Sequence, residues 1–325
     1  MSEHQTTPYP RSWYPVMIAG RLKPGQVKAV RAFGKDWLLF RGMDGNPGIV
    51  HRYCCHMGAD LSKGRVVGNN VECALHGWQF DCSGSCRKIP ALIDADVKQL
   101  EERKQTSLPC REAFGVIFAY YGDQPEYKLP VPAGMPKVMF GDCHVVNLNT
   151  EHHVPCLNTF DVQHYRKIHH RELLGEPVIK SVNSFHLGID MNIRVLPFNM
   201  LDRIMQRLTN GEASVIIDCW GGSILTMSNR KTGYGSIIAT LPVEAMKSRL
   251  FLIPVKRAKG DQHRAAGAGS RIALLLTAML VKGFLHPDEI ILAGMKPLRG
   301  KLLDGADDIV DRYWNFYHSL KVFDI

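Results

Sequence analysis

Residues 54–76 read CCHMGADLSKGRVVGNNVECALH, and this stretch decides the fold of the first part of the chain. Its pattern is C-x-H-x16-C-x2-H, with Cys54 and His56 in one half and Cys73 and His76 in the other. Each half follows a predicted strand, so the two loops can face each other at the tip of a small β module. The stretch therefore predicts a metal site that uses both thiolate and imidazole ligands.

Two kinds of metal site take this set of ligands. In a Rieske [2Fe-2S] cluster, two thiolates bind one iron and two imidazoles bind the other, which gives a higher potential than four thiolates give. A Cys2His2 zinc site uses the same residue types, but zinc fingers usually pair Cys with Cys and His with His. Two unrelated buried cysteines are a third alternative. The mixed loops favour the [2Fe-2S] cluster.

The neighbouring residues resemble those of the Rieske non-haem iron oxygenases. The resemblance is closest to the compact members with one type of subunit, which hydroxylate steroids and alkaloids. The family commonly has proline between the first Cys and His, whereas this chain has Cys55, an extra potential ligand. The segments that carry the resemblance are Gly58-Ala59-Asp60-Leu61, His76-Gly77-Trp78-Gln79-Phe80-Asp81, Gly84, Cys86 and Ile89-Pro90.

A second motif, N-x2-D-x2-H-x4-H, begins at Asn158 and contains Asp161, His164 and His169. On a helix, Asp161 and His164 share a face. His164 and His169 lie about 140° apart on an ideal helix, so both reach one metal only if the helix ends or widens between them, as at a π-bulge. His170 is the alternative to His169, and a solvated helix face is the alternative for the whole run.

The resemblance gives this motif its roles. It implies that His164 and His169 bind a mononuclear iron. It also implies that Asp161 is an electron-transfer bridge from His164 to a cluster histidine of the neighbouring subunit, with His76 preferred. Two histidines and one carboxylate form a facial triad that leaves coordination positions open.

The third iron ligand is expected far along the chain. Family members place it at the start of a late helix in a pattern like D-x-x-I-L, which Asp288 fits here, with Glu289 as the alternative. Pro287 and Asp288 also fit an ordinary helix start, since proline and acidic residues favour the first turn. The family often continues with acidic or Gln residues, whereas this chain continues with Ala293-Gly294-Met295-Lys296.

The strand and turn pattern predicts an α+β protein with two domains. We expect an N-terminal tail at residues 1–12, an all-β Rieske [2Fe-2S] domain at 13–125 and a catalytic mononuclear iron domain at 126–325, after a Pro-rich connector. The second domain is expected to be helix-grip-like, an antiparallel sheet with helices enclosing a cavity. Its predicted elements are strands at Ser214–Asp218, Gly222–Met227, Ser236–Leu241 and Leu250–Val255 and a helix at Asp307–Leu320.

Several features bear on the location of the protein. The longest apolar run, Ile272–Val281, has ten residues, too few to span a bilayer, and a buried strand is expected there. The N-terminus has no apolar segment typical of a secretory signal. The nine cysteines are an odd number, and without export they fit a reducing cytoplasm, where clustered Cys and His indicate metal.

The formal net charge of +9 is compatible with a basic surface for solubility, with docking of an acidic electron donor, or with peripheral contact to an anionic membrane. Nucleic-acid binding is not expected, because aromatic residues are not interleaved with the basic ones. No flavin or dinucleotide motif is visible. The resemblance therefore implies a separate flavin reductase fed by NAD(P)H, with or without a ferredoxin, and a homotrimer.

The function implied by the resemblance is that of a terminal oxygenase, monooxygenase or dioxygenase, with a Rieske cluster, a mononuclear Fe(II) and O2 as co-substrate. It would hydroxylate or oxidatively demethylate an apolar substrate. The apolar segments of the second domain predict either ordinary core packing or a cavity for a sterol- or terpenoid-like molecule, with no substrate-binding residue identified. The alternative function is a Rieske electron carrier fused to a non-catalytic lipid-binding domain.

Overall fold

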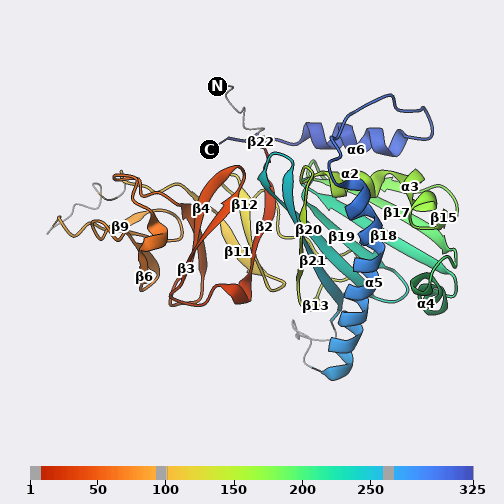
Figure 1. Ribbon diagram of the computed structural model, residues 1–325, viewed down its shortest axis with the longest axis horizontal. Coiled ribbons are helices and arrows are strands. Elements are labelled where there is room, and N and C mark those ends of the chain that lie inside the picture. Colours follow the sequence, from red (N-terminus) through yellow and green to blue (C-terminus); the bar gives the residue numbers. More distant parts are fainter. Residues whose placement is uncertain (1–8, 93–99, 101, 259–266, 325) are drawn as a thin grey trace. The chain divides into compact units, whose positions relative to one another are not determined.

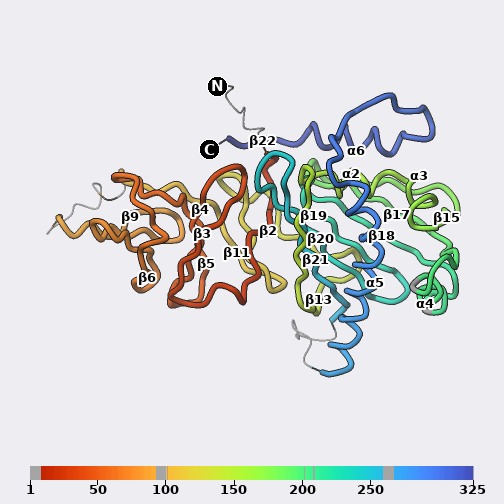
Figure 2. The backbone as a smooth tube through the Cα atoms, in the orientation of Figure 1, coloured from red at the N-terminus to blue at the C-terminus, as the bar shows by residue number. Residues whose placement is uncertain are grey.

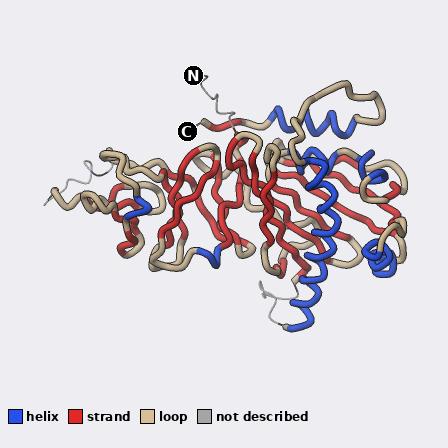
Figure 3. Tube along the Cα trace, in the orientation of Figure 1, coloured by secondary structure: helices blue, strands red, loops and turns tan. Residues whose placement is uncertain are grey.

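The computed structural model describes residues 9–92, 100, 102–258 and 267–324. The chain forms two compact units. One runs to Lys128 and includes Phe323, and the other runs from Leu129 to Val322. Figures 1 and 2 trace the chain through both, and Figure 3 shows that the regular structure of the first is mainly strands joined by loops.

The first unit contains three small antiparallel sheets with the orders β10-β5-β4-β3, β11-β12-β2 and β6-β7-β8-β9. Single turns of 3-10 helix, η1 (Ala19–Arg21) and η2 (Leu61–Lys63), interrupt them. The strands are β1 (Tyr9–Pro10), β2 (Ser12–Ile18), β3 (Val27–Ala32), β4 (Lys35–Arg41), β5 (Pro47–His51), β6 (Arg65–Val67), β7 (Asn70–Glu72), β8 (Gln79–Phe80), β9 (Cys86–Lys88), β10 (Ser107–Leu108), β11 (Cys110–Ala113) and β12 (Val116–Tyr121). β1 pairs with β22 (Val322–Phe323).

The second unit is built on a nine-stranded sheet with the order β13-β21-β20-β19-β18-β17-β15, to which β14 and β16 add at β21 and β17. All its pairings are antiparallel. The four consecutive strands expected from the sequence are β18 to β21. The strands are β13 (Val138–Phe140), β14 (His144–Leu148), β15 (Arg171–Leu173), β16 (Val178–Lys180), β17 (His186–Val195), β18 (Glu212–Trp220), β19 (Ile224–Asn229), β20 (Tyr234–Glu244) and β21 (Lys247–Arg257).

Helices accompany this sheet, and α5 runs along it (Figure 1). The main core of the unit joins inward side chains of β17, β18 and β19 to α2, α3 and α6, including Phe160 and Tyr313. This arrangement confirms the expected α+β class. The helices are α2 (Val154–Phe160), α3 (Val162–Lys167), α4 (Met200–Thr209), α5 (Ala268–Leu292) and α6 (Asp308–Ser319).

The strand expected at Ile272–Val281 is wrong, because this segment lies within α5. Its buried side chains, Leu274 and Ala278, are four residues apart, which is helical spacing. The segment is also rich in Ala, Leu and Met, which are strong helix formers. The expectation that this apolar run is too short to span a bilayer is also wrong, because by length and composition α5 could cross a membrane; 17% of its most apolar stretch is buried in the structure.

Candidate metal centres

The two Cys-His loops of the first unit have the same backbone turn. In each, the N–H of the cysteine donates to the carbonyl five residues later, at 2.9 Å from Cys54 and 2.8 Å from Cys73. The cysteine carbonyls accept from the N–H groups of Gly58 and Gly77, at 2.8 and 2.9 Å. Both glycines have positive φ, +74° and +70°, which glycine adopts without strain. The mixed spacing of the motif thus builds two equivalent loops.

The loops place the thiols inside and the imidazoles outside. Cys54 and Cys73 are each 3% exposed and belong to the core of the unit. The rings of His56 and His76 are exposed, with their centroids 4.9 Å apart. Burial, with the adjacent Cys73 thiol, raises the pKa of Cys54 to about 12. A cationic group that takes two thiolates and two imidazoles fits these donors, because it favours the deprotonated thiols.

Buried polar contacts hold the first loop. Gln105, 1% exposed, donates through Nε2 to the carbonyls of His51 and Tyr53, both at 2.8 Å, and accepts from the backbone N–H of Cys55 at 2.8 Å. The side chain of Cys55 itself is exposed. The backbone of Cys55, rather than its thiol, therefore contributes to the loop, in a way that proline could not.

An ion pair joins the strand before this loop to the residues after it. Nη2 and Nε of Arg52 lie 2.6 and 3.0 Å from the carboxylate oxygens of Asp60, which also accepts from the N–H of Ser62. The Arg52 guanidinium holds the pKa of the Asp60 carboxyl well below its ordinary value. On the other side, the ring of His56 stacks on Trp78 with centroids 4.2 Å apart.

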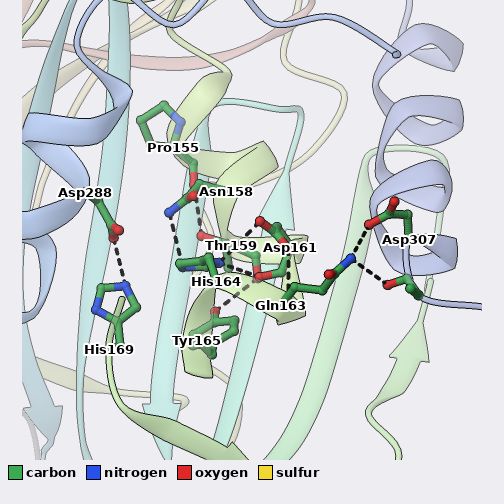
Figure 4. Close-up of polar contacts among 11 residues, drawn as sticks. Pro155, Asn158, Thr159, Asp161, Gln163, His164, Tyr165, His169, Asp288 and Asp307 are labelled. Atoms are coloured by element: carbon green, nitrogen blue, oxygen red, sulfur yellow. Dashed lines mark hydrogen bonds and ion pairs between the residues drawn. The ribbon is translucent and has the colours of Figure 1, made fainter. Parts of the chain in front are cut away.

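The second unit brings His164, His169 and Asp288 together. One possible ligand atom from each residue lies within 4.8 Å of the other two. Figure 4 shows the three side chains together with their polar neighbours. The rings of His164 and His169 have centroids 5.0 Å apart and stand at 76°. The two alternative ligands that the sequence offered, His170 and Glu289, have other contacts. His170 stacks on Phe198 at 3.7 Å, and Glu289 lies 3.7 Å from His286.

The local backbone explains how both histidines reach one point. The run is not one helix, because α2 ends at Phe160 and Asp161 serves as the N-cap of α3, accepting from the N–H of Gln163 at 3.0 Å. α3 ends at Lys167, so His169 lies beyond the helix. Of the two solutions expected from the spacing, the chain uses a helix end rather than a π-bulge.

Asp288 does not stand at a helix start. α5 begins twenty residues earlier, at Ala268, and Pro287 lies inside it. Asp288 belongs to the buried stripe of α5 with Leu274, Ala278 and Leu292, and this register points its carboxylate toward the histidines. Pro287 removes one backbone hydrogen bond from the helix just before the carboxylate.

The charge states of the cluster suit metal binding. Burial lowers the pKa of His164, although the nearby Asp288 carboxylate opposes this effect. The neutral imidazole is the form that binds metals. Nδ1 of His164 donates to the carbonyl of Asp161, which leaves Nε2 as the ligand atom, with the amide nitrogen of Asn158 3.3 Å away. Two imidazoles and a carboxylate are the donor set of non-haem iron sites, so the residues fit such an ion.

An apolar cavity of about 160 Å³ reaches this cluster at His169. A second cavity of about 40 Å³ reaches it at His164 and Asp288, and Phe284 lines both. The ring of Phe284 stacks on His169, with centroids 3.8 Å apart. Sequence reasoning missed this phenylalanine. Other apolar residues of the larger cavity are Met191, Ile193, Met205, Val215, Ile217 and Met227.

A buried ion pair adjoins the larger cavity. Nη2 of Arg171 lies 2.7 Å from Oδ1 of Asp202, and Nη1 of Arg171 donates to the carbonyl of His169 at 2.7 Å. Asp202 also completes the capping box of α4 with Asn199. Arg171 thus ties the backbone of one candidate ligand to the first turn of α4. Sequence spacing carried no signal for a pair 31 residues apart.

The first unit of the chain resembles a known protein domain. The family model of the Rieske [2Fe-2S] domain matches residues 12–101. The cholesterol 7-desaturase of Ciona intestinalis is 38% identical over 126 residues, which are 38% of this chain and 26% of that protein. The chain thus matches about a quarter of the length of this relative.

Two other known proteins match along nearly the whole chain. The aminopyrrolnitrin oxygenase PrnD of Pseudomonas fluorescens is 27% identical, with 97% of this chain and 92% of that protein covered. The crystal structure of dicamba monooxygenase bound to dicamba aligns with a TM-score of 0.64 at 16% identity and covers 96% of this chain and 97% of the other. At this identity, the likeness to the crystal structure shows the fold.

Proposed function

We propose that the chain is a Rieske non-haem iron oxygenase, which its matches to the Rieske [2Fe-2S] domain and to PrnD support, and that it is the terminal oxygenase of a multicomponent system. It receives electrons from a separate ferredoxin or flavin reductase, since no flavin or dinucleotide motif is visible in its sequence. Its product is an apolar molecule oxidised at a C–H bond by hydroxylation or oxidative demethylation. NAD(P)H is the ultimate electron source.

The observation that carries this proposal is the convergence of His164, His169 and Asp288 at the wall of an apolar cavity. These residues would hold the mononuclear iron, and Cys54, His56, Cys73 and His76 would hold the cluster. When bound, the cluster supplies single electrons and the iron supplies reductive activation of oxygen. The side chains that bind and orient the substrate are the apolar ones of β17, β18, β19 and α5.

The protein residues have distinct tasks in this scheme. The carbonyl of Asp161 fixes the tautomer and the ring orientation of His164. The side chain of Asp161 is 36% exposed and can accept a further hydrogen bond, as a bridge to a histidine of a neighbouring subunit requires. A homotrimer in which each cluster serves the next subunit supplies that histidine. Phe284 excludes water from one face of His169.

The substrate class follows from the cavity wall. Its side chains are mainly Ile, Val, Leu, Met and Phe, so a molecule held there gains affinity from buried apolar area. A sterol- or terpenoid-like substrate fits this chemistry, and the name of the Ciona relative, cholesterol 7-desaturase, supports the choice. The odd number of cysteines and their clustering with histidines support a reducing cytoplasm as the location.

The second candidate function is a Rieske electron carrier fused to a lipid-binding domain without catalysis. Asp288 argues against it. This carboxylate is 7% exposed on an apolar helix and lies 3.1 Å from Nε2 of His169, and burying such ionisable groups costs free energy that binding a metal would offset. A lipid-binding domain has no need of such a group beside two histidines.

A single-turnover experiment tests the proposal. The anaerobic holoprotein is reduced, mixed with a sterol or terpenoid and exposed to labelled oxygen. We expect cluster oxidation together with label in the hydroxylated product, or in the trapped formaldehyde where a methyl group is removed, for the wild type, and neither at a comparable rate for His164→Ala. Cluster oxidation at the same rate in both proteins, without product from any apolar substrate, would support the electron carrier instead.

A further inference from the structure

Helix α5 carries a second apolar stripe on its outer side. Ile272, Leu275, Leu276 and Met279 are each more than half exposed. Their spacing of three and four residues places them on one helix face, away from the buried Leu274, which packs on the sheet strand β13. A contiguous exposed apolar stripe of this kind typically marks an interaction surface.

The outer stripe leads toward the iron site. Directly after Met279, Leu280 and Gly283 line the larger cavity, and the ring of Phe284 stacks on that of His169. The candidate ligand Asp288 lies one turn further along. One helix therefore carries exposed apolar side chains, part of the cavity wall and one residue of the candidate metal centre.

Helix α4 borders the same cavity and is also apolar on its outside. Met205 and Asp202 line the cavity. Phe198, just before the helix, is 68% exposed, Met200 80% and Ile204 41%. We call the exposed apolar residues of α4 and α5, with Phe198, the α4–α5 face.

Cations accompany this face, and α4 and α5 themselves carry few acidic residues, while Asp142 of the segment before β14 lines a hollow together with Arg271 and Ile272. Arg203 and Arg207 of α4 and Arg271 and Lys282 of α5 are exposed. Asp202, the acidic residue of α4, is buried against Arg171. The acidic residues of α5 are Asp288 and Glu289, near its far end. Exposed apolar side chains with flanking Lys and Arg are the pattern of proteins that lie on anionic lipid surfaces.

We propose that the α4–α5 face docks on an anionic lipid surface and that a lipophilic substrate passes from the bilayer into the cavity between α4 and α5. The entry of substrate from the bilayer rests on the proposed function, whereas the docking on lipid does not depend on it. α5 lies along the membrane rather than across it, because Leu274 is held on the sheet. A second copy paired through this same face fits less well, since that two-fold contact would oppose these cations with the same cations.

Flotation with two vesicle populations tests the docking. One contains phosphatidylcholine alone, and the other contains phosphatidylcholine with phosphatidylglycerol. We expect the holoprotein to float with the anionic vesicles. The bound fraction should fall several-fold in Leu276→Asn/Met279→Asn and in Arg203→Glu/Arg207→Glu. Leu303→Asn is the matched control, because Leu303 is 64% exposed in the loop that follows α5, and it should bind like the wild type.

A tryptophan reporter tests which surface touches lipid. We expect brominated lipid in anionic vesicles to quench the added fluorescence of Leu276→Trp and not that of Leu303→Trp. Equal vesicle binding by the wild type and the Leu276→Asn/Met279→Asn variant would overturn the proposal. So would no vesicle binding together with a smaller oligomer in that variant, which would assign the face to a second copy. Neither readout needs turnover, so failure of the proposed function would leave this result intact.

Discussion

Nε2 of His169 lies 3.1 Å from Oδ2 of Asp288, although 119 positions separate the two residues in the sequence. Both side chains are nearly inaccessible to solvent, at 2% and 10% exposure. The end of α3 and the buried register of α5 converge on this contact, and His164 joins it from the side. The contact therefore links the motif near residue 160 to the late carboxylate.

Replacing Asp288 with Ala tests the carboxylate of the candidate iron site. We expect the variant to keep the [2Fe-2S] cluster and to lose the mononuclear iron, because the two histidines alone leave the site without its anionic ligand. Iron analysis and the spectrum of the reduced cluster measure the two centres separately. Glu289→Ala is the control and should keep both. Loss of iron from Glu289→Ala alone would reverse the assignment.

Replacing Asp161 with Asn tests the electron bridge. Asn preserves the N-cap of α3, so the variant should fold and hold both metals. We expect oxidation of its reduced cluster by oxygen and substrate to slow by about 10–100-fold, the usual effect of changing a group that supports a metal ligand. Stopped-flow absorbance measures this rate. An unchanged rate with intact metal content would exclude Asp161 from the bridge.

The buried pair of Arg171 and Asp202 gives a stability prediction. Arg171→Met leaves Asp202 buried without its partner, which should lower the free energy of unfolding by about 3–5 kcal/mol. Arg171→Met/Asp202→Leu should recover part of this loss, because no unpaired charge remains. Chemical denaturation of the three proteins measures the difference. Equal losses of unfolding free energy in the single and double variants would mean that the unpaired charge of Asp202 contributes little to the loss.

The ion pair of Arg52 and Asp60 predicts a pH dependence. The pKa of Asp60 is lower in the folded protein than its ordinary value. Its contribution to stability is therefore present above the unfolded pKa, about 3.9, and is lost as the pH falls toward the folded pKa. Asp60→Asn should unfold at a lower temperature than the wild type at neutral pH, and the gap should close in acid. A gap independent of pH would contradict this account.

Cys55 offers a test of its backbone role. Cys55→Ser keeps the N–H that donates to Gln105 and should leave cluster content and spectrum unchanged. Cys55→Pro removes that donor from a buried acceptor, which should cost about 1–3 kcal/mol. Thermal unfolding and absorbance compare the two. Loss of the cluster in Cys55→Ser would show that the thiol is a ligand after all.

The sequence predicted local features well and distant ones less well. The Cys-His loops and the strands β18 to β21 follow from short patterns, and α6 follows from its apolar face. The helix at residues 272–281 was missed because an apolar run by itself does not distinguish a strand from a helix. The same error placed Asp288 at a helix start, although α5 begins at Ala268.

The cavity wall was predictable only in part. Alternation along β17 buries Met191 and Ile193 on one side, and this pattern was available in the sequence. The stacking of Phe284 on His169 and the pairing of Arg171 with Asp202 depend on how distant elements pack, and no short pattern encodes them. The identity of the metal ligands came from the family resemblance, and their convergence came from the structure.

Iron and acid-labile sulfide, measured per chain in protein purified anaerobically, test the central claim most directly. We expect about three irons for two sulfides, from one [2Fe-2S] cluster and one mononuclear iron. We also expect His164→Ala to lose one iron and keep the cluster spectrum. Equal iron and sulfide, unchanged after addition of ferrous iron, would contradict the oxygenase and leave an electron carrier. Zinc without sulfide would contradict both metal assignments.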